Sequence, residues 1–389
     1  MANLQPDTVV VTASCLCRAH AFSVAVSRSS LPLEATACHC DSCRHASGAM
    51  YVQVATWPQP KESVDLGGLQ RYQFSADLAY RFCGTCSASM FYEYTQEPSR
   101  LSVVTGVLAN TEVNLIHVTR HIFVGDTLDG GATVWLRTPN PDGKAVPRYR
   151  TWVDAIPWDG SDALPAAADE KEDNEPQEPP ASVPIVCHCG GVNFRLHRGP
   201  YASMDRAALP WNVDPATNKL LASFDACDSC RTQYGTDLVN WTFSDLAYLA
   251  TADDNRDGGR TLPTTTAALK VAVDRCEPAL GTLVYYQSSA AVQRYFCRVC
   301  SAGIFYTHDD RPTMVDIAIG VLTAPDGVRA ESLLSWNMGG TPAWVQDAKG
   351  GWREGLVERI RAGAEEYRLA RNYPKNWHRV RREAEGITG

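Results

Sequence analysis

The sequence predicts a mainly β protein with two tandem β domains and a C-terminal helix. Three observations carry this prediction: both halves contain the same series of cysteine motifs, short β-branched segments alternate with turn residues, and helical apolar spacing stands out only near the C-terminus. The length points the same way, because 389 residues exceed what one hydrophobic core usually serves. Two domains are therefore expected.

The internal repeat is the strongest signal in the chain. Each half has a C-x-C pair, then a central cysteine loop, then a C-x-x-C pair. These motifs are Cys15–Cys17, Cys38–Cys43 and Cys83–Cys86 in the first half, and Cys187–Cys189, Cys227–Cys230 and Cys297–Cys300 in the second. Gly106-Val107-Leu108 also recurs as Gly320-Val321-Leu322. We expect domains at 8–158 and 183–347, a linker at 159–182 and a helical tail at 348–389.

Each domain is expected to be an antiparallel β unit. The candidate strands are short and are either β-branched or alternating in polarity. They are Val9–Val11, Phe22–Val26, Met50–Val54 and Ser102–Val104, then Val192–Leu196, Gly281–Tyr286 and Val315–Ile319. Such thinly cored sheets commonly rely on zinc held by cysteine pairs at hairpin ends.

The linker carries most of the net charge. It holds eight acidic residues and one lysine, which account for −7 of the total −8, together with several prolines. This composition favours a solvated, self-repelling spacer. The remainder is nearly neutral, so we do not expect a nucleic-acid partner. The tail has Leu356, Ile360, Ala364 and Tyr367 at helical spacing until Pro374, which predicts a packed helix with a solvated basic face.

The chain shows no membrane or secretion signal. No run approaches about 18 apolar residues, and the N-terminus lacks the pattern of a secretory signal. We expect a cytoplasmic protein, in which clustered cysteines indicate metal more often than disulfides. Cys276 stands outside the motifs and is expected to be a small buried apolar residue rather than a nucleophile.

Counting thiols predicts one closed zinc site in each domain. Four thiolates complete a tetrahedral set and leave no open position, so both sites should be structural. The ligands are Cys15, Cys17, Cys83 and Cys86 in the first domain, and Cys187, Cys189, Cys297 and Cys300 in the second.

The central loop of the first half has three further thiols, Cys38, Cys40 and Cys43. Three protein ligands leave a fourth position for water or substrate, which is typical of catalytic zinc. The alternative is a closed site with its fourth ligand from His39, His45 or elsewhere.

These motifs in combination carry a family resemblance. Cys15-x-Cys17, Cys38-His39-Cys40-x-x-Cys43-Arg44, Arg81-Phe82-Cys83-x-x-Cys86 and His121-Ile122-Phe123-Val124 resemble the glutathione-dependent formaldehyde-activating enzyme / centromere protein V family. The resemblance covers both halves and implies a β-tent fold with a four-cysteine structural zinc. It also implies a second, catalytic zinc on Cys38, Cys40 and Cys43, and carbon–sulfur lyase chemistry on glutathione adducts.

The second half departs from the pattern at its central loop. Asp225 stands where Cys38 stands, and Ala226 and Thr232 replace the two histidines, while Cys227 and Cys230 remain. Asp225 could still bind zinc through oxygen. We expect this fourth zinc site to be weak or absent.

Two classes of function follow. The first is a zinc-dependent lyase at the first repeat that acts on a small molecule, for which the resemblance implies glutathione. In it, His39 and His45 would carry protons, and Arg44 and Arg81 would hold a carboxylate, unless these residues only brace the fold. The second is a non-catalytic zinc module that binds a protein or nucleic acid. In both, we expect the two repeats to pack as an internal pseudo-dimer.

Overall fold

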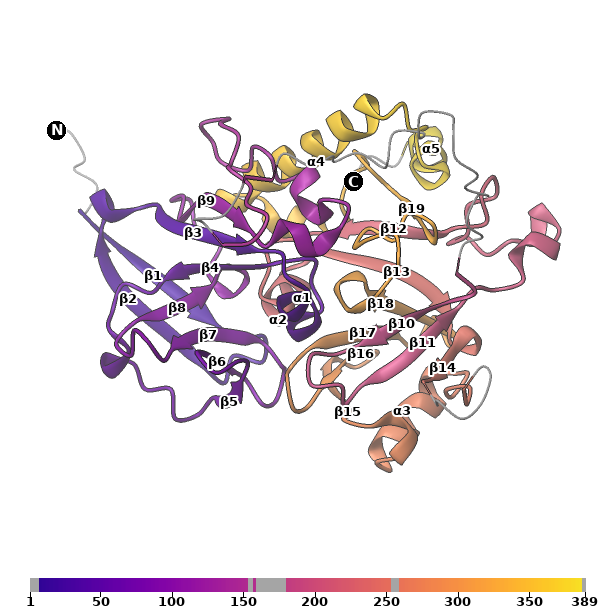
Figure 1. Cartoon of the computed structure of the whole chain (residues 1–389), viewed down its shortest axis with the longest axis horizontal. Coiled ribbons are helices and arrows are strands. Elements are labelled where there is room, and N and C mark those ends of the chain that lie inside the picture. The colour runs from indigo at the N-terminus through magenta and orange to yellow at the C-terminus, as the bar shows by residue number, and fades with distance from the viewer. Residues whose placement is uncertain (1–6, 153–156, 159–179, 253–258, 387–389) are drawn as a thin grey trace.

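The computed structural model describes residues 7–152, 157–158, 180–252 and 259–386. These residues form two halves, each built on a seven-stranded sheet (Figure 1). The first sheet has the order β5 (Gln70–Gln73), β6 (Leu78–Phe82), β7 (Ser89–Tyr94), β8 (Leu101–Val104), β4 (Val52–Thr56), β3 (Leu33–Cys38) and β9 (Ile116–Ile122). The second has the order β15 (Leu283–Ser289), β16 (Val292–Cys297), β17 (Gly303–His308), β18 (Met314–Ala318), β13 (Val239–Asp245), β12 (Leu220–Asp225) and β19 (Leu334–Trp336). The predicted fold class, mainly β with two tandem units and a C-terminal helix, is confirmed.

The two sheets match in strand direction as well as in order. Neighbouring strands are antiparallel throughout, except at one edge of each sheet, where β3 runs parallel to β9 and β12 runs parallel to β19. Each sheet therefore has a parallel strand pair at the corresponding edge. This agrees with the repeat read from the cysteine motifs.

A smaller sheet packs on each large one. In the first half it is the hairpin of β1 (Thr8–Ser14) and β2 (Ala21–Ser27). In the second it consists of β10 (Ser182–Val186), β11 (Asn193–His197) and β14 (Leu249–Thr251). Phe22 meets Phe91 edge to face at 5.0 Å, and Phe194 stacks on Phe305 at 5.9 Å. These aromatic pairs join the two layers and fill the core of each half.

All seven candidate strands overlap observed strands, but three short helices had no sequence signal. They are α1 (Asp41–Ser47), α2 (Asp228–Tyr234) and α3 (Thr266–Asp274). Seven to nine residues are too few for helical periodicity to stand out. The prediction for Cys276 was wrong, because its side chain is exposed just after α3, where its backbone has a φ of 52°.

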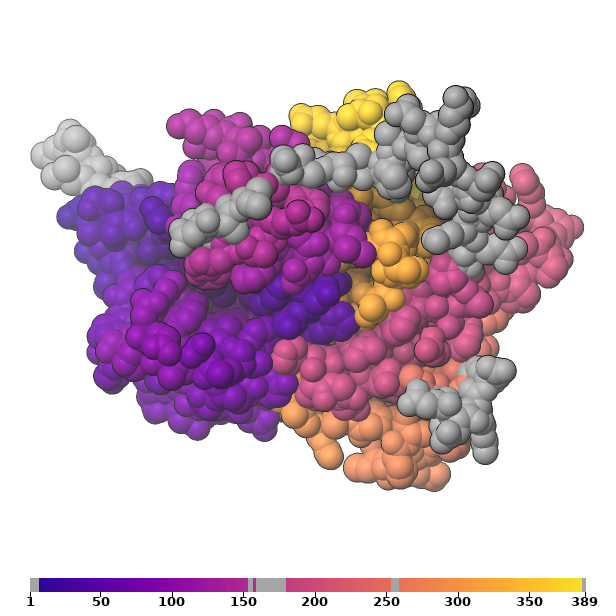
Figure 2. Space-filling model, viewed as in Figure 1, coloured from indigo at the N-terminus to yellow at the C-terminus, as the bar shows by residue number. Residues whose placement is uncertain are grey.

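The halves meet through α1 and α2, which lie between the two sheets (Figure 1). Arg44 of α1 donates to Gly320 O at 3.3 Å, and Gly320 N donates to Gly48 O at 3.1 Å. The contact is reciprocated from the other half. Arg231 of α2 donates to Gly106 O at 2.6 Å, and Gly106 N donates to Gly235 O at 3.3 Å. Each half thus uses the same pair of elements on the other, and the two halves lie directly against each other in Figure 2.

The repeated Gly-Val-Leu motifs lie at this contact. A Cβ atom at Gly106 would stand 2.4 Å from the carbonyl carbon of Gly235, and one at Gly320 would stand 2.1 Å from Ala49 O. Both distances are far below van der Waals contact, so only glycine permits this close approach of two backbones. The recurrence of the motif therefore has a packing reason.

The C-terminal helix α4 (Trp352–Ala370) binds both halves and is followed by α5 (Trp377–Ala384). The predicted apolar face, Leu356, Ile360, Ala364 and Tyr367, is buried. Arg353 forms an ion pair with Asp237 of the second half at 2.8 Å and donates to Leu108 O and Thr105 O of the first. The helix therefore joins the two units.

Two further sequence predictions concern the linker and membrane spans. Most of the predicted linker, residues 159–179, lies outside the described residues. Within the part of the chain that the structure describes, no helix has the length and apolar character needed to cross a bilayer.

Candidate metal centres

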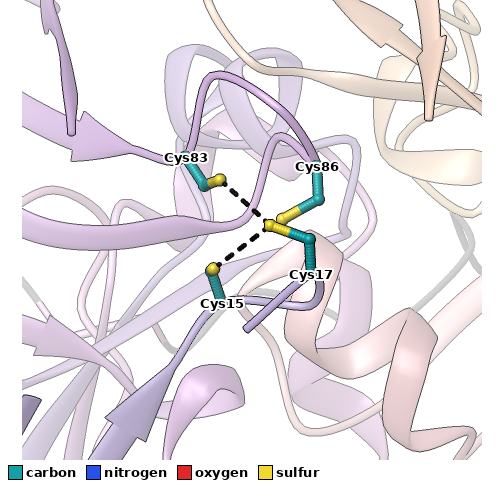
Figure 3. A group of neighbouring side chains, drawn as sticks. All are labelled: Cys15, Cys17, Cys83 and Cys86. Atoms are coloured by element: carbon teal, nitrogen blue, oxygen red, sulfur yellow. Dashed lines mark hydrogen bonds between the residues drawn. The ribbon is translucent and has the colours of Figure 1, made fainter. Parts of the chain in front are cut away.

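The four thiols predicted to close the first-half site come together (Figure 3). Cys15 and Cys17 lie in the turn after β1, and Cys83 and Cys86 lie in the turn between β6 and β7. Cys17 Sγ is 3.6 Å from both Cys15 Sγ and Cys83 Sγ. Sulfurs bound at about 2.3 Å to one tetrahedral zinc are about 3.8 Å apart, whereas a disulfide spans about 2.05 Å. The spacing fits a metal site.

The second half has an equivalent cluster. Cys189 Sγ lies 3.6 Å from Cys187 Sγ and 3.4 Å from Cys297 Sγ, and Cys300 completes the group. A backbone N–H donates to the first sulfur of each cluster, at 3.3 Å from His20 N to Cys15 Sγ and at 3.2 Å from Val192 N to Cys187 Sγ. Such donors stabilise thiolates, the form that binds metal.

The central loop of the first repeat brings Cys38, Cys40 and Cys43 together at the start of α1. Their sulfurs lie within 4.8 Å of one another, and Cys38 Sγ is 3.5 Å from Cys40 Sγ. Hydrogen bonds from Cys38 and Cys43 lower the pKa of Cys40 to about 3. Among the described residues no fourth ligand joins the group. This favours the open site over the closed alternative, since neither His39 nor His45 is a member.

The aromatic residues around this loop were not singled out from the sequence. Tyr80, Phe82 and Tyr92 are buried beside Cys43, and Tyr72 and Phe74 pack against the same cluster. Burial and the charge of Cys43 raise the pKa of Tyr92 well above its usual range. The loop therefore faces a wall made by β5, β6 and β7. Aromatic residues on strands are equally common in plain cores, so the sequence carried no specific signal.

The second half contributes His188 to the edge of this wall. Its Nδ1 is 2.8 Å from the hydroxyl of Tyr72, and its ring stacks on Phe74 at 4.6 Å. Its backbone N–H donates to the backbone carbonyl of His45 at 2.9 Å. Burial lowers the pKa of His188, and the negative charge of Cys40 acts in the opposite direction. His188 lies between Cys187 and Cys189, so the four-cysteine cluster of the second half adjoins the three-cysteine cluster of the first.

His39 is fully buried and hydrogen-bonded to another histidine. Its Nε2 is 3.0 Å from Nδ1 of His121, whose Nε2 is 3.0 Å from Leu136 O. Because a carbonyl can only accept, His121 donates through Nε2, and its Nδ1 accepts from His39. Nδ1 of His39 then carries no proton, and it has no partner among the described residues. Burial and His121 lower the pKa of His39.

His45 and Arg44, the other predicted catalytic residues, contact the second half. His45 Nδ1 is 2.5 Å from Val186 O, while Arg44 binds Asp41 and Gly320 O. These contacts favour the bracing alternative for both, and their catalytic roles stay predictions. Arg81 is similarly occupied, since it donates to Glu93 at 2.8 Å.

The central loop of the second repeat has a different set of contacts. Asp225 accepts from Cys227 N at 2.8 Å and from Trp241 Nε1 at 3.0 Å, and Cys230 Sγ lies 3.4 Å from its Oδ2. Arg294 Nη1 is 3.4 Å from Cys230 Sγ. Burial raises the pKa of Asp225 to about 7, and a hydrogen bond from Cys230 lowers that of Cys227 to about 6. The three ligand atoms lie within 4.8 Å and could hold a metal.

One comparison with known proteins gives a match. Residues 10–126 match the family model described as glutathione-dependent formaldehyde-activating enzyme. The matched stretch lies within the first repeat. It includes Cys15, Cys17, Cys83, Cys86 and the central loop, and so contains both first-half clusters. Neither the curated proteins nor the solved structures yield a match to the chain.

Proposed function

We propose that the first repeat is a zinc-dependent lyase that makes or breaks a carbon–sulfur bond between a glutathione-type thiol and a small reactive carbonyl. The observation that carries this proposal is the three-thiol cluster with no fourth protein ligand among the described residues, in the repeat that matches the family. Glutathione enters through the family, since no residue of the site selects it.

Cys38, Cys40 and Cys43 would hold the catalytic zinc, and their sulfurs suit it by type and spacing. When bound, the metal would bind a substrate thiolate or polarise a carbonyl in its open position. The two four-cysteine clusters would hold structural zinc. We therefore expect three zinc ions per chain.

The surrounding residues of the chain have separate parts in this proposal. The aromatic wall of Tyr80, Phe82 and Tyr92 keeps water from one side of the cluster. Tyr72 and His188 offer polar atoms at its edge. His39 stays the candidate for proton transfer because its Nδ1 has a free lone pair.

The second repeat acts as a scaffold in this proposal, and the two repeats form an internal pseudo-dimer. Reciprocal contacts support it: Arg44 binds Gly320 as Arg231 binds Gly106. His188 gives a direct reason for the scaffold, because it reaches the first-repeat wall. All cysteines are free, which suits a reducing compartment such as the cytoplasm.

The test uses full-length protein mixed with glutathione and formaldehyde, and then with other small aldehydes. NMR exchange measures adduct formation and breakdown, and elemental analysis of the same sample measures zinc. We expect Cys40→Ala to reduce the rate by at least about a hundredfold, and Cys227→Ala, its counterpart, to leave the rate within about twofold of wild type. Absence of turnover in zinc-loaded wild type would instead support the non-catalytic zinc module.

A further inference from the structure

The central loop of the second repeat keeps two thiols at the start of α2. Cys227 is half-buried and Cys230 is buried, both are free, and their sulfurs lie within 4.8 Å. In a C-x-x-C turn, side-chain rotation can bring two such sulfurs to bonding distance. The pair therefore has the arrangement of a half-buried attacking thiol and a buried resolving thiol.

A buried cation lies against this pair. Arg294 is 4 % exposed, and Nη1 is 3.4 Å from Cys230 Sγ. Its other hydrogen bonds go to neutral atoms, Ser288 Oγ at 3.0 Å and Gln233 Oε1 at 3.4 Å, and it lies 5.2 Å from the centre of the Tyr306 ring. The Asp316 carboxylate is also close enough to interact with it, but forms its ion pair with Arg311 at 2.7 Å. A buried guanidinium is costly without an anion beside it. A thiolate at the cysteine pair would supply that anion.

A buried carboxylate can accept the proton of the resolving thiol. Asp225 Oδ2 lies 3.4 Å from Cys230 Sγ, and the carboxylate is fixed by Cys227 N and by Trp241 Nε1. The first repeat has a third thiol at this position. The substitution of Cys38 by Asp225 thus exchanges a soft metal ligand for a group that moves protons.

The position of Arg294 distinguishes this loop from the metal-binding type. Counting back from the C-x-x-C pairs, Arg294 corresponds to Tyr80 of the first repeat. A fixed positive charge at hydrogen-bond distance from a sulfur opposes binding of a divalent cation there. The same charge stabilises a thiolate without any metal.

We propose that Cys227 and Cys230 form a metal-free, redox-active dithiol that exchanges with a low-molecular-weight disulfide of the glutathione disulfide class. This activity is separate from the lyase proposed for the first repeat. Neither the thiols nor Arg294 takes part in that reaction.

The exchange balances in two steps. The Cys227 thiolate attacks one sulfur of the disulfide RSSR, forms a mixed disulfide and releases one RS⁻. Cys230 then gives its proton to Asp225 and attacks Cys227 Sγ, which forms the protein disulfide and releases a second RS⁻. The two protein thiols are oxidised, RSSR accepts two electrons, and the two protons end on two RSH molecules.

The test incubates full-length protein with graded mixtures of glutathione and glutathione disulfide. Rapid alkylation and peptide mass spectrometry then report the state of every cysteine. We expect one reversible transition in which Cys227 and Cys230 become protected together, while Cys38, Cys40 and Cys43 stay unchanged. The proposal is overturned if both second-repeat thiols remain reduced in every mixture.

Variants separate the parts of the proposal. Cys230→Ser should trap glutathione on Cys227, because the resolving thiol is gone. Arg294→Met should slow the reaction by at least about tenfold, while Arg294→Lys, the matched control, should stay within a few-fold of wild type. Zinc per chain should not change in Cys227→Ser. A loss of one zinc in that variant, or a wild-type rate in Arg294→Met, would contradict the proposal; the wild-type titration stands even if a variant fails to fold.

Discussion

The two central loops share a scaffold but differ in chemistry. Each loop follows a strand of the large sheet and starts a seven-residue helix. The arginine of each helix donates a hydrogen bond to the carbonyl oxygen of a glycine in the other half. Within this frame, Cys38 corresponds to Asp225, and Tyr80 to Arg294. The first loop therefore has three thiols beside aromatic rings, whereas the second has two thiols between a carboxylate and a guanidinium. The contacts that hold the halves together are therefore shared by the two repeats, while two positions beside the loop differ in chemical type.

Loss of a structural ligand should have the largest effect. Cys83→Ser and Cys297→Ser each leave a closed site one ligand short, and we expect either to lower the free energy of unfolding by about 4 kcal/mol or more. Cys40→Ser should cost much less stability, because we propose that its loop holds the catalytic rather than a structural zinc. Denaturant unfolding with zinc analysis measures both. Equal losses from all three variants would mean that the central loop is structural too.

The next effect concerns pH and the buried histidine pair of the first repeat, His39 and His121. Burial lowers the pKa of His121 to about 4 from an ordinary 6.5, so the native state keeps this ring neutral while the unfolded chain protonates it. Stability is therefore full above pH 6.5 and falls as the pH drops towards 4, by up to about 3 kcal/mol. Unfolding measured between pH 4.5 and 8 should show a smaller drop in His121→Gln.

The second repeat offers an internal comparison for this pH effect. The strand registers place Ala343 opposite Asp225 as Ile122 is opposite Cys38, so Pro342 corresponds to His121. Ala226 likewise occupies the position that corresponds to His39. Amide exchange should therefore report acid-induced opening in the first repeat before the second. The same acid response in wild type and His121→Gln would remove the histidine pair as its cause.

The reciprocal glycines should give intermediate effects. Gly106→Ala and Gly320→Ala each force a Cβ atom into the backbone of the other half, at an expected cost of about 1–3 kcal/mol in unfolding free energy. Gly143→Ala is a suitable control, since its Cβ would have nothing within 4 Å and only its positive φ is strained. Thermal unfolding measures all three. Unequal costs for Gly106 and Gly320 would show that the contact is less symmetric than its hydrogen bonds.

The smallest effect is expected from His188→Leu, which copies Leu16 of the first repeat. The change removes the hydrogen bond to Tyr72 and the stack on Phe74, which together contribute about 1 kcal/mol. We expect the KM for a glutathione adduct to rise about fivefold, with zinc content and kcat nearly unchanged. Leu16→Ala tests the matching position of the first repeat. A fall in kcat alone in His188→Leu would argue against a role at the edge of the site.

Much of the site could be predicted because thiol motifs are local. Cys15 and Cys17 form one local pair, and Cys83 and Cys86 form another. Counting four thiols is therefore enough to predict a closed site, even though the sequence does not give the distance between the two pairs. The candidate strands were readable from alternation. Contacts between the halves could not be predicted from the sequence. The partner of Gly106 is Gly235, far along the chain, and no local pattern encodes this close contact of two backbones. The same limit hid His188 and the aromatic wall.

One ion pair has a consequence for the order in which the protein can assemble. Asp237 is buried with Thr105 and Gln53 of the first half at 2.8 and 3.2 Å, but its countercharge is Arg353. Since α4 follows both repeats in the chain, Arg353 is synthesised only after both repeats. Until then the joined halves would bury an unpaired carboxylate, at a cost of several kcal/mol. The final closure of the two repeats should therefore wait until the C-terminal helix has been synthesised.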